Sequence, residues 1–437
     1  MDPREPAWTT EPDAPDPTSP DAARARLVTE LRHRGGALSR SVQDAFARVP
    51  RHVFVPEVGP AAAYRDEAFV IKCGPDGMPV SSSSQPAMMA IMLEQLGLRP
   101  GHRVLEIGTG SGYNAAVMAA VVGPGGEVVS IDIDADLVTR AQASLVAAGF
   151  DAVRVRCGDG GFGDPAGAPF DRIIVTAGAW DIAPAWLDQL GPGGRLVLPL
   201  SVRGIQLSVA LEQAGQEWVS TSAWRCGFVR MLGAFAGPER VLMLAEPRAL
   251  CAQMSDGNPV DGGALQRALA GPVADAPVNV RLVDVTDLAD LDLWLTVTSA
   301  DLTRLTILAA PGGWLRLGPV LPVGGLAGHA DDPDQLGLAL VLPAELGAGG
   351  PADAAVRASL AGRRATLAVV SGFGPGGAAL ADRLATQAAQ WGRLGRPGAR
   401  DLQLTVWHAG GEPRAQTAAE RVVLRRPSVT IAAGWPT

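Results

Sequence analysis

Two polar stretches combine residue types that could bind and orient a small charged group. The first, SSSSQP at residues 81–86, places four hydroxyl side chains before an amide and a proline. The second, VLEIGTGSGY at residues 104–113, places three glycines at alternate positions. Hydroxyls donate hydrogen bonds without carrying charge, and glycines let a backbone approach a ligand closely. The pair predicts a backbone cradle opposed by hydroxyl donors, although a serine run can also be a solvated linker.

The glycine stretch has the context of a nucleotide-binding loop. It follows a predicted strand and opens a predicted helix, whose first N–H groups are free to meet a ligand. A dinucleotide loop would place its third glycine at position 113, which is Tyr113 here. The observed GxGxG spacing with Glu106 before it is found in enzymes that use S-adenosylmethionine (SAM), because an acidic residue tolerates the positive sulfonium and ammonium. A tight structural turn is the alternative.

Acidic residues at two more predicted strand ends favour the cofactor site over a plain turn. Asp132 ends the second strand, where a carboxylate can accept both ribose hydroxyls. Asp159, in a GDG triplet, ends the third strand, where it can accept a hydrogen bond from the adenine amine. The predicted cofactor-binding residues are Glu106, Gly108, Thr109, Gly110, Ser111, Gly112, Asp132, Ile133, Gly158, Asp159, Gly160 and Thr176.

Alternating strands and helices are predicted to position these residues. Near-continuous apolar runs, typical of strands buried on both faces of a parallel sheet, occur at 103–107, 127–132, 153–157, 171–176 and 195–200. Helix-forming stretches at 115–122 and 137–148 separate them, helices are predicted within 21–50, and 206–211 with 217–220 form a predicted hairpin. This order predicts an α/β, Rossmann-like domain with a mostly parallel sheet.

Composition excludes several classes of function. A net charge of −8 and a pI near 5.3 disfavour nucleic acid as a partner. No apolar run reaches the ~20 residues of a membrane span. The four cysteines lie far apart without a CxxC motif, so neither a metal site nor a disulfide framework is predicted. We expect a reduced, cytoplasmic protein without a metal; the sequence does not predict its oligomeric state.

The 437 residues divide into three predicted segments. Residues 1–20 are rich in proline and aspartate and are predicted to be disordered, 21–237 form the SAM-dependent domain, and 238–437 form a C-terminal α+β domain. Within the last segment, Trp294 and Trp391 are predicted core residues, His329 is predicted in a solvated loop, and 371–377 is a predicted turn. Its predicted helix is 378–391, and its predicted strands are 279–285, 293–297, 313–317, 337–342, 365–371, 402–408 and 421–433.

Several motifs resemble the protein-L-isoaspartate O-methyltransferase family over residues 38–235: VPRHVFVP (49–56), SSSSQP, VLEIGTGSGYNAAVMA (104–119), GDG and PFDRIIVTAGA (169–179). The resemblance implies methyl transfer from SAM to a peptide carboxylate, with S-adenosyl-L-homocysteine (SAH) as product. A carboxylate is already ionised at neutral pH, so the enzyme must mainly position it. The resemblance makes Ser84 the substrate-orienting serine and Ser82 the replacement of a threonine. Ser83 departs from the usual isoleucine, and Gln85 completes the loop.

A weaker resemblance covers nearly the whole chain. CGFVRMLG (226–233), LADLDLWLTV (288–297) and RPSVTIAAGWP (426–436) resemble C-terminally extended relatives from gene clusters for ribosomally made, lanthipeptide-type peptides (RiPPs). It implies methylation of an aspartate in a modified, constrained precursor peptide, followed by an aspartimide that can hydrolyse to isoaspartate. Arg225 and Arg230 are candidates to meet an acidic peptide. Repair of isoaspartyl proteins and a non-catalytic SAM- or peptide-binding scaffold remain alternatives.

Overall fold

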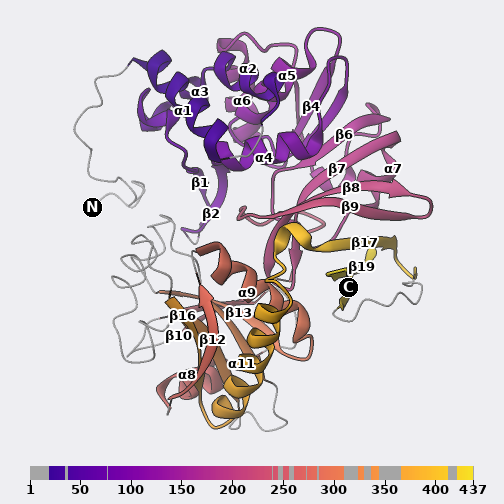
Figure 1. The fold of residues 1–437 in the computed structure, drawn as a ribbon. Coiled ribbons are helices and arrows are strands. Elements are labelled where there is room, and N and C mark those ends of the chain that lie inside the picture. Colours follow the sequence, from indigo (N-terminus) through magenta and orange to yellow (C-terminus); the bar gives the residue numbers. More distant parts are fainter. Residues whose placement is uncertain are drawn as a thin grey trace.

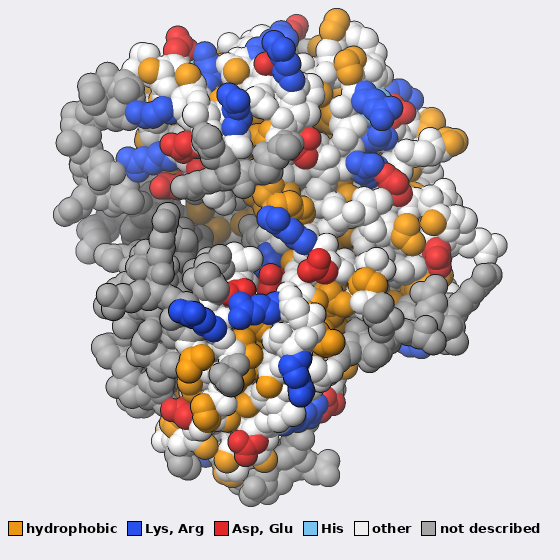
Figure 2. Space-filling view, in the orientation of Figure 1, with side chains coloured by type: hydrophobic (Ala, Val, Ile, Leu, Met, Phe, Trp, Pro, Cys, Tyr) orange, Lys and Arg blue, Asp and Glu red, His pale blue; other side chains and the backbone are white. Residues whose placement is uncertain are grey.

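The structure is a computed structural model. In Figure 1 it has an upper half with the N-terminal helices and a long sheet, and a lower half with a second sheet. On the face seen in Figure 2, Lys and Arg side chains lie among Asp and Glu side chains over both halves. The residues described are 19–34, 38–75, 77–238, 240–244, 250–254, 260–271, 273–282, 285–309, 323–328, 336–343, 366–411 and 421–436.

Short helices and one hairpin precede the main sheet. They are α1 (Pro20–Arg34), α2 (Arg40–Arg48), α3 (Arg51–Phe54), two 3-10 turns η1 (Pro56–Val58) and η2 (Ala62–Tyr64), and the hairpin of β1 (Phe69–Cys73) with β2 (Pro79–Ser83). The helix predicted within 21–50 is confirmed as α1 and α2. The disorder predicted for 1–20 falls on residues outside the described part, except that α1 already begins at Pro20.

Five strands form the parallel part of the main sheet, in the spatial order β5-β4-β3-β6-β7. Helices α4 (Pro86–Leu96), α5 (Tyr113–Val122), α6 (Ala135–Ala147) and α7 (Pro184–Asp188) accompany these strands. The strands are β3 (Arg103–Ile107), β4 (Glu127–Asp132), β5 (Arg154–Cys157), β6 (Phe170–Val175) and β7 (Leu190–Val202). The predicted Rossmann-like order is confirmed, and β3 and β4 have the predicted bounds.

The main sheet continues into the C-terminal part of the chain. The predicted hairpin is confirmed as β8 (Ile205–Ala214) and β9 (Glu217–Arg225), antiparallel to β7. Beyond β9 lie β17 (Gln403–His408), β19 (Val429–Gly434) and β18 (Arg421–Arg425), which complete ten strands among the described residues. Figure 1 shows these yellow strands beside β8 and β9. The main sheet therefore contains strands from both sides of residue 237, the predicted domain boundary.

The second sheet has the order β10-β11-β13-β14-β15-β16-β12, with every neighbouring pair antiparallel. Its helices are α8 (Gly262–Ala270), α9 (Val285–Thr298) and α11 (Gly377–Arg393). Its strands are β10 (Arg240–Leu244), β11 (Leu250–Met254), β12 (Val273–Leu282), β13 (Thr303–Ala309), β14 (Val323–Gly328), β15 (Gly337–Pro343) and β16 (Thr366–Phe373). The strands predicted at 337–342 and 365–371 and the helix at 378–391 are confirmed.

Two predictions for the C-terminal segment are wrong. The single strand predicted at 421–433 is two antiparallel strands, β18 and β19, joined by a turn. Residues 293–297 form part of α9 and not a strand. Leu291, Leu293, Leu295 and Val297 alternate along the sequence and are all buried, but so are Trp294 and Thr296 between them. A helix buried on nearly all sides loses its 3.6-residue periodicity, which explains the misassignment. The strand predicted at 313–317 and the loop predicted around His329 lie outside the described residues.

The two halves share one apolar core. A single cluster of buried side chains runs from β7 and β8 into α9 and α11, and it includes Trp294 and Trp391, as predicted. Polar contacts lie beside it: the buried Arg203 guanidinium donates to the carbonyls of Thr296 at 3.0 Å and Ser299 at 2.9 Å, at the end of α9. Among the described residues, no helix is long and apolar enough to cross a membrane.

Candidate active site

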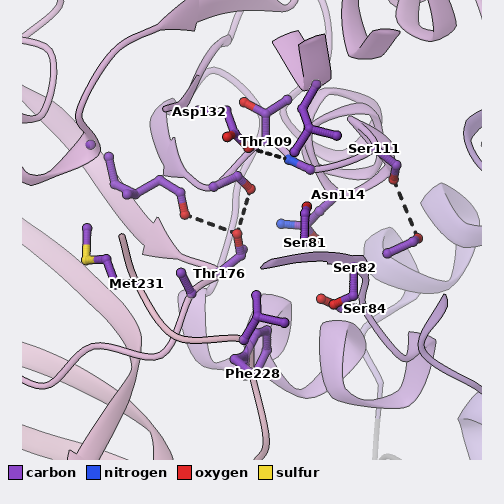
Figure 3. A pocket seen from close by; sticks show the side chains of 18 of the residues that line it. Ser81, Ser82, Ser84, Thr109, Ser111, Asn114, Asp132, Thr176, Phe228 and Met231 are labelled. Carbon is purple, nitrogen blue, oxygen red and sulfur yellow. Dashed lines mark hydrogen bonds between the residues drawn. The ribbon is translucent and has the colours of Figure 1, made fainter. Parts of the chain in front are cut away.

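A pocket opens at the carboxyl ends of β3, β4 and β6, where the strand order of the sheet reverses. This is the usual place for a ligand in an open α/β sheet. Figure 3 shows its walls: the glycine loop and Asp132 on one side, the serine stretch on another, and Phe228 and Met231 on a third. The pocket therefore brings together the two stretches from which the sequence predicted a site.

The glycines of the loop are required by backbone conformation and by space. Gly108, Gly110 and Gly112 have φ of +100°, +52° and +85°, in the left-handed region that side chains rarely adopt. A Cβ at Gly108 would lie 2.5 Å from Thr176 Oγ1, which itself donates to the Gly108 carbonyl at 2.6 Å. Gly108, Thr109, Gly110, Ser111 and Thr176 line the pocket, whereas Gly112 packs against α6.

Asp132 lies at the end of β4, as predicted, and its carboxylate reaches the pocket. It accepts hydrogen bonds from the backbone N–H of Gly110 at 2.9 Å and of Asp134 at 3.1 Å. Burial raises the pKa of Asp132, and these two N–H groups oppose that rise. Each carboxylate oxygen has further acceptor capacity, so Asp132 can take ribose hydroxyls without losing its backbone partners. Ile133, next along, also lines the pocket.

Glu106 is not at the pocket surface, which corrects the prediction that it faces the cofactor. Its side chain is fully buried in β3, where Oε1 accepts from Asn114 Nδ2 at 2.7 Å and Oε2 accepts from Ser130 Oγ at 2.5 Å. Burial raises the pKa of Glu106 to about 7. Inside a strand with both faces covered, the sequence does not indicate which residue faces a ligand.

Asp159 is not among the residues that line the pocket. Its carboxylate accepts from Gly161 N at 2.9 Å and from Ala234 N at 2.7 Å, so it anchors the chain at Ala234. Each oxygen keeps further acceptor capacity, and the contact of Asp159 with adenine stays a prediction. Of the GDG triplet, only Gly160 lines the pocket. The acceptor for the adenine amine was assigned from strand position alone, and the partner at Ala234 lies far away in sequence.

The serine stretch is a strand and not a solvated linker. Ser81 and Ser83 are buried and Ser82 is half-buried, which is the alternation expected along β2. All four serines, Ser81 to Ser84, line the pocket. Ser111 Oγ donates to Ser83 Oγ at 3.5 Å, so the strand touches the glycine loop directly (Figure 3). Gln85 does not line the pocket; its Nε2 donates to Asp66 Oδ2 at 3.1 Å.

Two cations fix the serine hairpin, and the sequence prediction missed both. Arg51 is fully buried, and its guanidinium donates to the Ser84 carbonyl at 2.9 Å and to the carbonyls of Ala63, Arg65 and Glu67. Lys72, the only lysine of the chain, pairs with Asp134 at 2.6 Å, just after the predicted ribose carboxylate. Arg51 lies in the VPRHVFVP motif, which carried a family resemblance but no predicted role.

Residues 228–232, here termed the strap, cover the pocket on the side opposite the glycine loop. Gln206 holds the first residue of the strap by accepting from Phe228 N at 2.7 Å and donating to its carbonyl at 3.1 Å. Gly178 pairs with the strap through the Val229 carbonyl and the Met231 N–H. The strap includes Arg230, which lines the pocket as a substrate-binding candidate should.

Arg225 does not reach the pocket, which corrects its assignment to substrate binding. Its guanidinium donates to the Ala289 carbonyl at 2.6 Å and lies 3.5 Å from Asp292, which also pairs with the buried Arg304 at 2.9 Å. These partners belong to α9 and β13, so Arg225 joins the two halves of the molecule. A surface arginine and one at an internal contact look alike in sequence.

The fold and the pocket together define a class of protein. A glycine loop after the first parallel strand, an acidic residue ending the next strand and a pocket at the switch point are the features of a Rossmann-like, SAM-dependent methyltransferase domain. The residues fit such a cofactor: glycines leave room for it, Asp132 can accept hydroxyls, and Asn114 Oδ1 is a buried acceptor without a donor among the described residues. In the described part, no cluster of His, Cys, Asp or Glu could hold a metal.

Comparison with known proteins identifies the family. A family model described as Protein-L-isoaspartate(D-aspartate) O-methyltransferase matches residues 22–234. A protein-L-isoaspartate O-methyltransferase of Methanopyrus kandleri is 42% identical over 221 residues, which are 95% of that protein and 50% of this chain. A second, from Archaeoglobus fulgidus, is 43% identical over 212 residues, or 92% of its length. The chain belongs to the protein-L-isoaspartate O-methyltransferase family.

Two solved structures are similar to parts of this chain. One protein-L-isoaspartate O-methyltransferase has a TM-score of 0.45 and 23% identity, and the match covers 87% of this chain and 96% of that one. A Plasmodium falciparum structure described as the same kind of enzyme, in complex with SAH, has a TM-score of 0.42 and covers 48% of this chain. The family match confirms the predicted cofactor and enzyme class: the protein is a SAM-dependent carboxyl O-methyltransferase. Its narrower resemblance to RiPP-cluster relatives stays a prediction.

Proposed function

We propose that the protein methylates the side-chain carboxylate of an aspartate in a constrained, ribosomally made peptide of the lanthipeptide type. The ester would then be lost as the following backbone nitrogen attacks, giving an aspartimide that can open to isoaspartate. The observation that carries this proposal is the second half of the chain, which contributes strands to the catalytic domain's own sheet. The match to the Methanopyrus kandleri relative takes up 95% of that protein but only half of this chain.

The pocket supports transfer to a carboxylate. An aspartate carboxylate is ionised at neutral pH and attacks the methyl group without a general base, so the main requirement is orientation. Hydroxyl donors on β2 can hold such a group without adding a competing charge. We assign the central orienting role to Ser84, whose carbonyl is fixed by Arg51, and a supporting role to Ser82. Asp132 is assigned to the ribose hydroxyls, and Arg230 to the peptide.

Contacts between the C-terminal half and the pocket walls support a role in substrate recognition. The turn between β18 and β19 packs on the loop after β6: Arg426 stacks 4.0 Å over the Trp180 ring, and Ser428 N donates to Asp181 at 2.9 Å. The same loop begins with Thr176 and Ala177 in the pocket, and its Gly178 holds the strap. A peptide bound to the C-terminal half would therefore lie against elements that contact the pocket.

A second candidate function is repair of damaged proteins at L-isoaspartyl residues. The observation that favours it is the 42% identity to a protein-L-isoaspartate O-methyltransferase over nearly the whole of that relative. Both functions use the same methyl transfer, so the residues of the pocket do not discriminate between them. Under the repair hypothesis the second half would have a role outside substrate choice.

The test is mass spectrometry on two peptides of one sequence, incubated separately with the full-length protein and SAM. One peptide is cyclised and carries a normal aspartate; the other is linear and carries isoaspartate. The proposal predicts that the cyclised peptide gains a methyl group and then loses methanol, which leaves it one water lighter. Methylation of the linear isoaspartyl peptide alone would reject the proposal in favour of repair, and methylation of neither would favour a binding scaffold.

A further inference from the structure

Asn114, in the first turn of α5, has one half of its amide paired and the other half free. Its Nδ2 donates to Glu106 Oε1 at 2.7 Å. Its Oδ1 is buried and has no hydrogen-bond donor among the residues that the structure describes. Asn114 lines the pocket, as Figure 3 shows. A buried acceptor without a donor is unfavourable, so an orphaned amide oxygen in a ligand pocket indicates that the ligand supplies the donor.

A buried hydrogen-bond network determines which end of this amide faces the ligand. Glu106 Oε1 accepts from the amide nitrogen of Asn114, so the amide oxygen of Asn114 is turned away from Glu106. Its second oxygen accepts the Ser130 hydroxyl at 2.5 Å, and Thr109 Oγ1, 2.7 Å from Ser130 Oγ, then donates to Ser130. Glu106, Ser130 and Thr109 are all buried. Glu106, which is buried and does not line the pocket itself, thus orients two residues that do, Asn114 directly and Thr109 through Ser130.

The missing donor can be identified from the chemistry of the cofactor. SAM and SAH both join an adenosine to an aminoacyl chain that ends in an ammonium and a carboxylate. Asn114 lies in the part of the pocket between the glycine loop and β2, with Ser81 and Ser111. With Asp132 assigned to the ribose, we place the aminoacyl chain in this part of the pocket. An ammonium is a charged donor, and an amide oxygen backed by a buried carboxylate is a favourable acceptor for it.

We infer that Asn114 accepts a hydrogen bond from the aminoacyl ammonium of the cofactor, and that Glu106 is a positioning residue that holds Asn114 in the required orientation. The inference deepens the cofactor assignment of the proposed function and does not depend on the peptide substrate. It also gives the acidic residue before the glycine loop a role consistent with its burial.

The test compares two ligands that differ only in the part that Asn114 is inferred to bind. SAH carries the aminoacyl chain, whereas 5′-methylthioadenosine keeps the adenosine and thioether and lacks that chain. Titration calorimetry on Asn114→Leu, which is similar in size but cannot accept, should show SAH weakened by roughly 10- to 100-fold, the range of a hydrogen bond to a charged group. Methylthioadenosine should stay within about twofold of its wild-type affinity, since its contacts are unchanged.

Two further variants separate the inference from a general loss of structure. Glu106→Gln should show the same selective loss for SAH, because a glutamine can donate to Asn114 and reverse its amide. Asp132→Ala is the control that should weaken both ligands, since both contain the ribose. If Asn114→Leu weakens both ligands equally, or neither, the inference is wrong. Asn114→Ala repeats the comparison without the bulk of leucine, and the ratio of the two affinities does not depend on the folded fraction.

Failure of this inference can be told apart from failure of the proposed function. A protein that shows the selective loss for SAH but methylates no cyclised peptide would keep the inference and reject the substrate. A protein that methylates the cyclised peptide but keeps its SAH affinity after Asn114→Leu would support the proposed substrate and reject the role of Asn114.

Discussion

Glutamine in place of Glu106 should change how the stability of the protein depends on pH. Burial raises the pKa of Glu106 from 4.5 to about 7 in the folded state. Below the lower value, the folded and unfolded states both hold the proton. Between the two values, the unfolded state releases it and the folded state keeps it, so the wild type loses stability as pH rises. Above the upper value the loss is complete and constant. Glutamine does not titrate, so the Glu106→Gln variant does not lose this part of its stability as pH rises.

The size of the effect follows from the pKa difference. At about 1.4 kcal/mol for each pH unit between the two values, the wild type should lose about 3 kcal/mol relative to Glu106→Gln. The comparison is made between proteins because Asp132, whose pKa burial also raises, titrates in both of them. The absolute stability of Glu106→Gln also reflects altered hydrogen bonds to Asn114 and Ser130, but that contribution does not change with pH.

The assay is urea unfolding of the wild type and Glu106→Gln at several pH values from about 5 to about 8, without cofactor. The difference in unfolding free energy should shift steadily in favour of the variant up to about pH 7 and then become constant. A difference that does not change with pH would refute the reasoning, because it would mean that Glu106 titrates alike in the folded and unfolded states.

Three other substitutions test the site and the contact between the halves. Asp132→Ala should weaken SAM binding by roughly 1.5–3 kcal/mol, measured by calorimetry, and unchanged affinity would remove Asp132 from the cofactor site. Ser84→Ala should lower turnover with little change in SAM affinity, and full activity of this variant would reject the orienting role of Ser84. Asp292→Ala, which removes the buried carboxylate that Arg225 and Arg304 share, should destabilise the fold by about 3–5 kcal/mol in urea unfolding. A loss below about 1 kcal/mol would mean that this network behaves as an exposed ion pair.

The sheet and the general place of the site could be predicted because they depend on local signals. The apolar runs at 103–107 and 127–132 correspond to β3 and β4, and the glycine loop follows the first of them. The serine stretch was placed at the site by its resemblance to the family, and the alternating burial along β2 is consistent with that placement. Each of these features is encoded within about ten residues, which is the range over which periodicity and turn signals act.

The remainder depends on contacts between residues that are distant in sequence. Glu106 was predicted to face the cofactor, but its partners are Ser130 and Asn114, and the contact of Asp159 with Ala234 was not predicted. Strands β9 and β17 pair although the whole second sheet lies between them in the sequence. No local sequence pattern indicates this pairing. The strap was likewise missed, because loop residues close a pocket through tertiary contacts and not through any spacing of their own.

The most direct test of the proposed function is a competition in one reaction mixture. Equal amounts of the cyclised aspartyl peptide and the linear isoaspartyl peptide are incubated with the full-length protein and limiting SAM, and both products are followed by mass spectrometry. A rigid substrate loses less conformational freedom on binding, which a dedicated maturation enzyme can exploit. The account predicts that the cyclised peptide takes most of the methyl groups and then loses methanol. Preferential methylation of the linear isoaspartyl peptide would contradict it and establish repair as the activity.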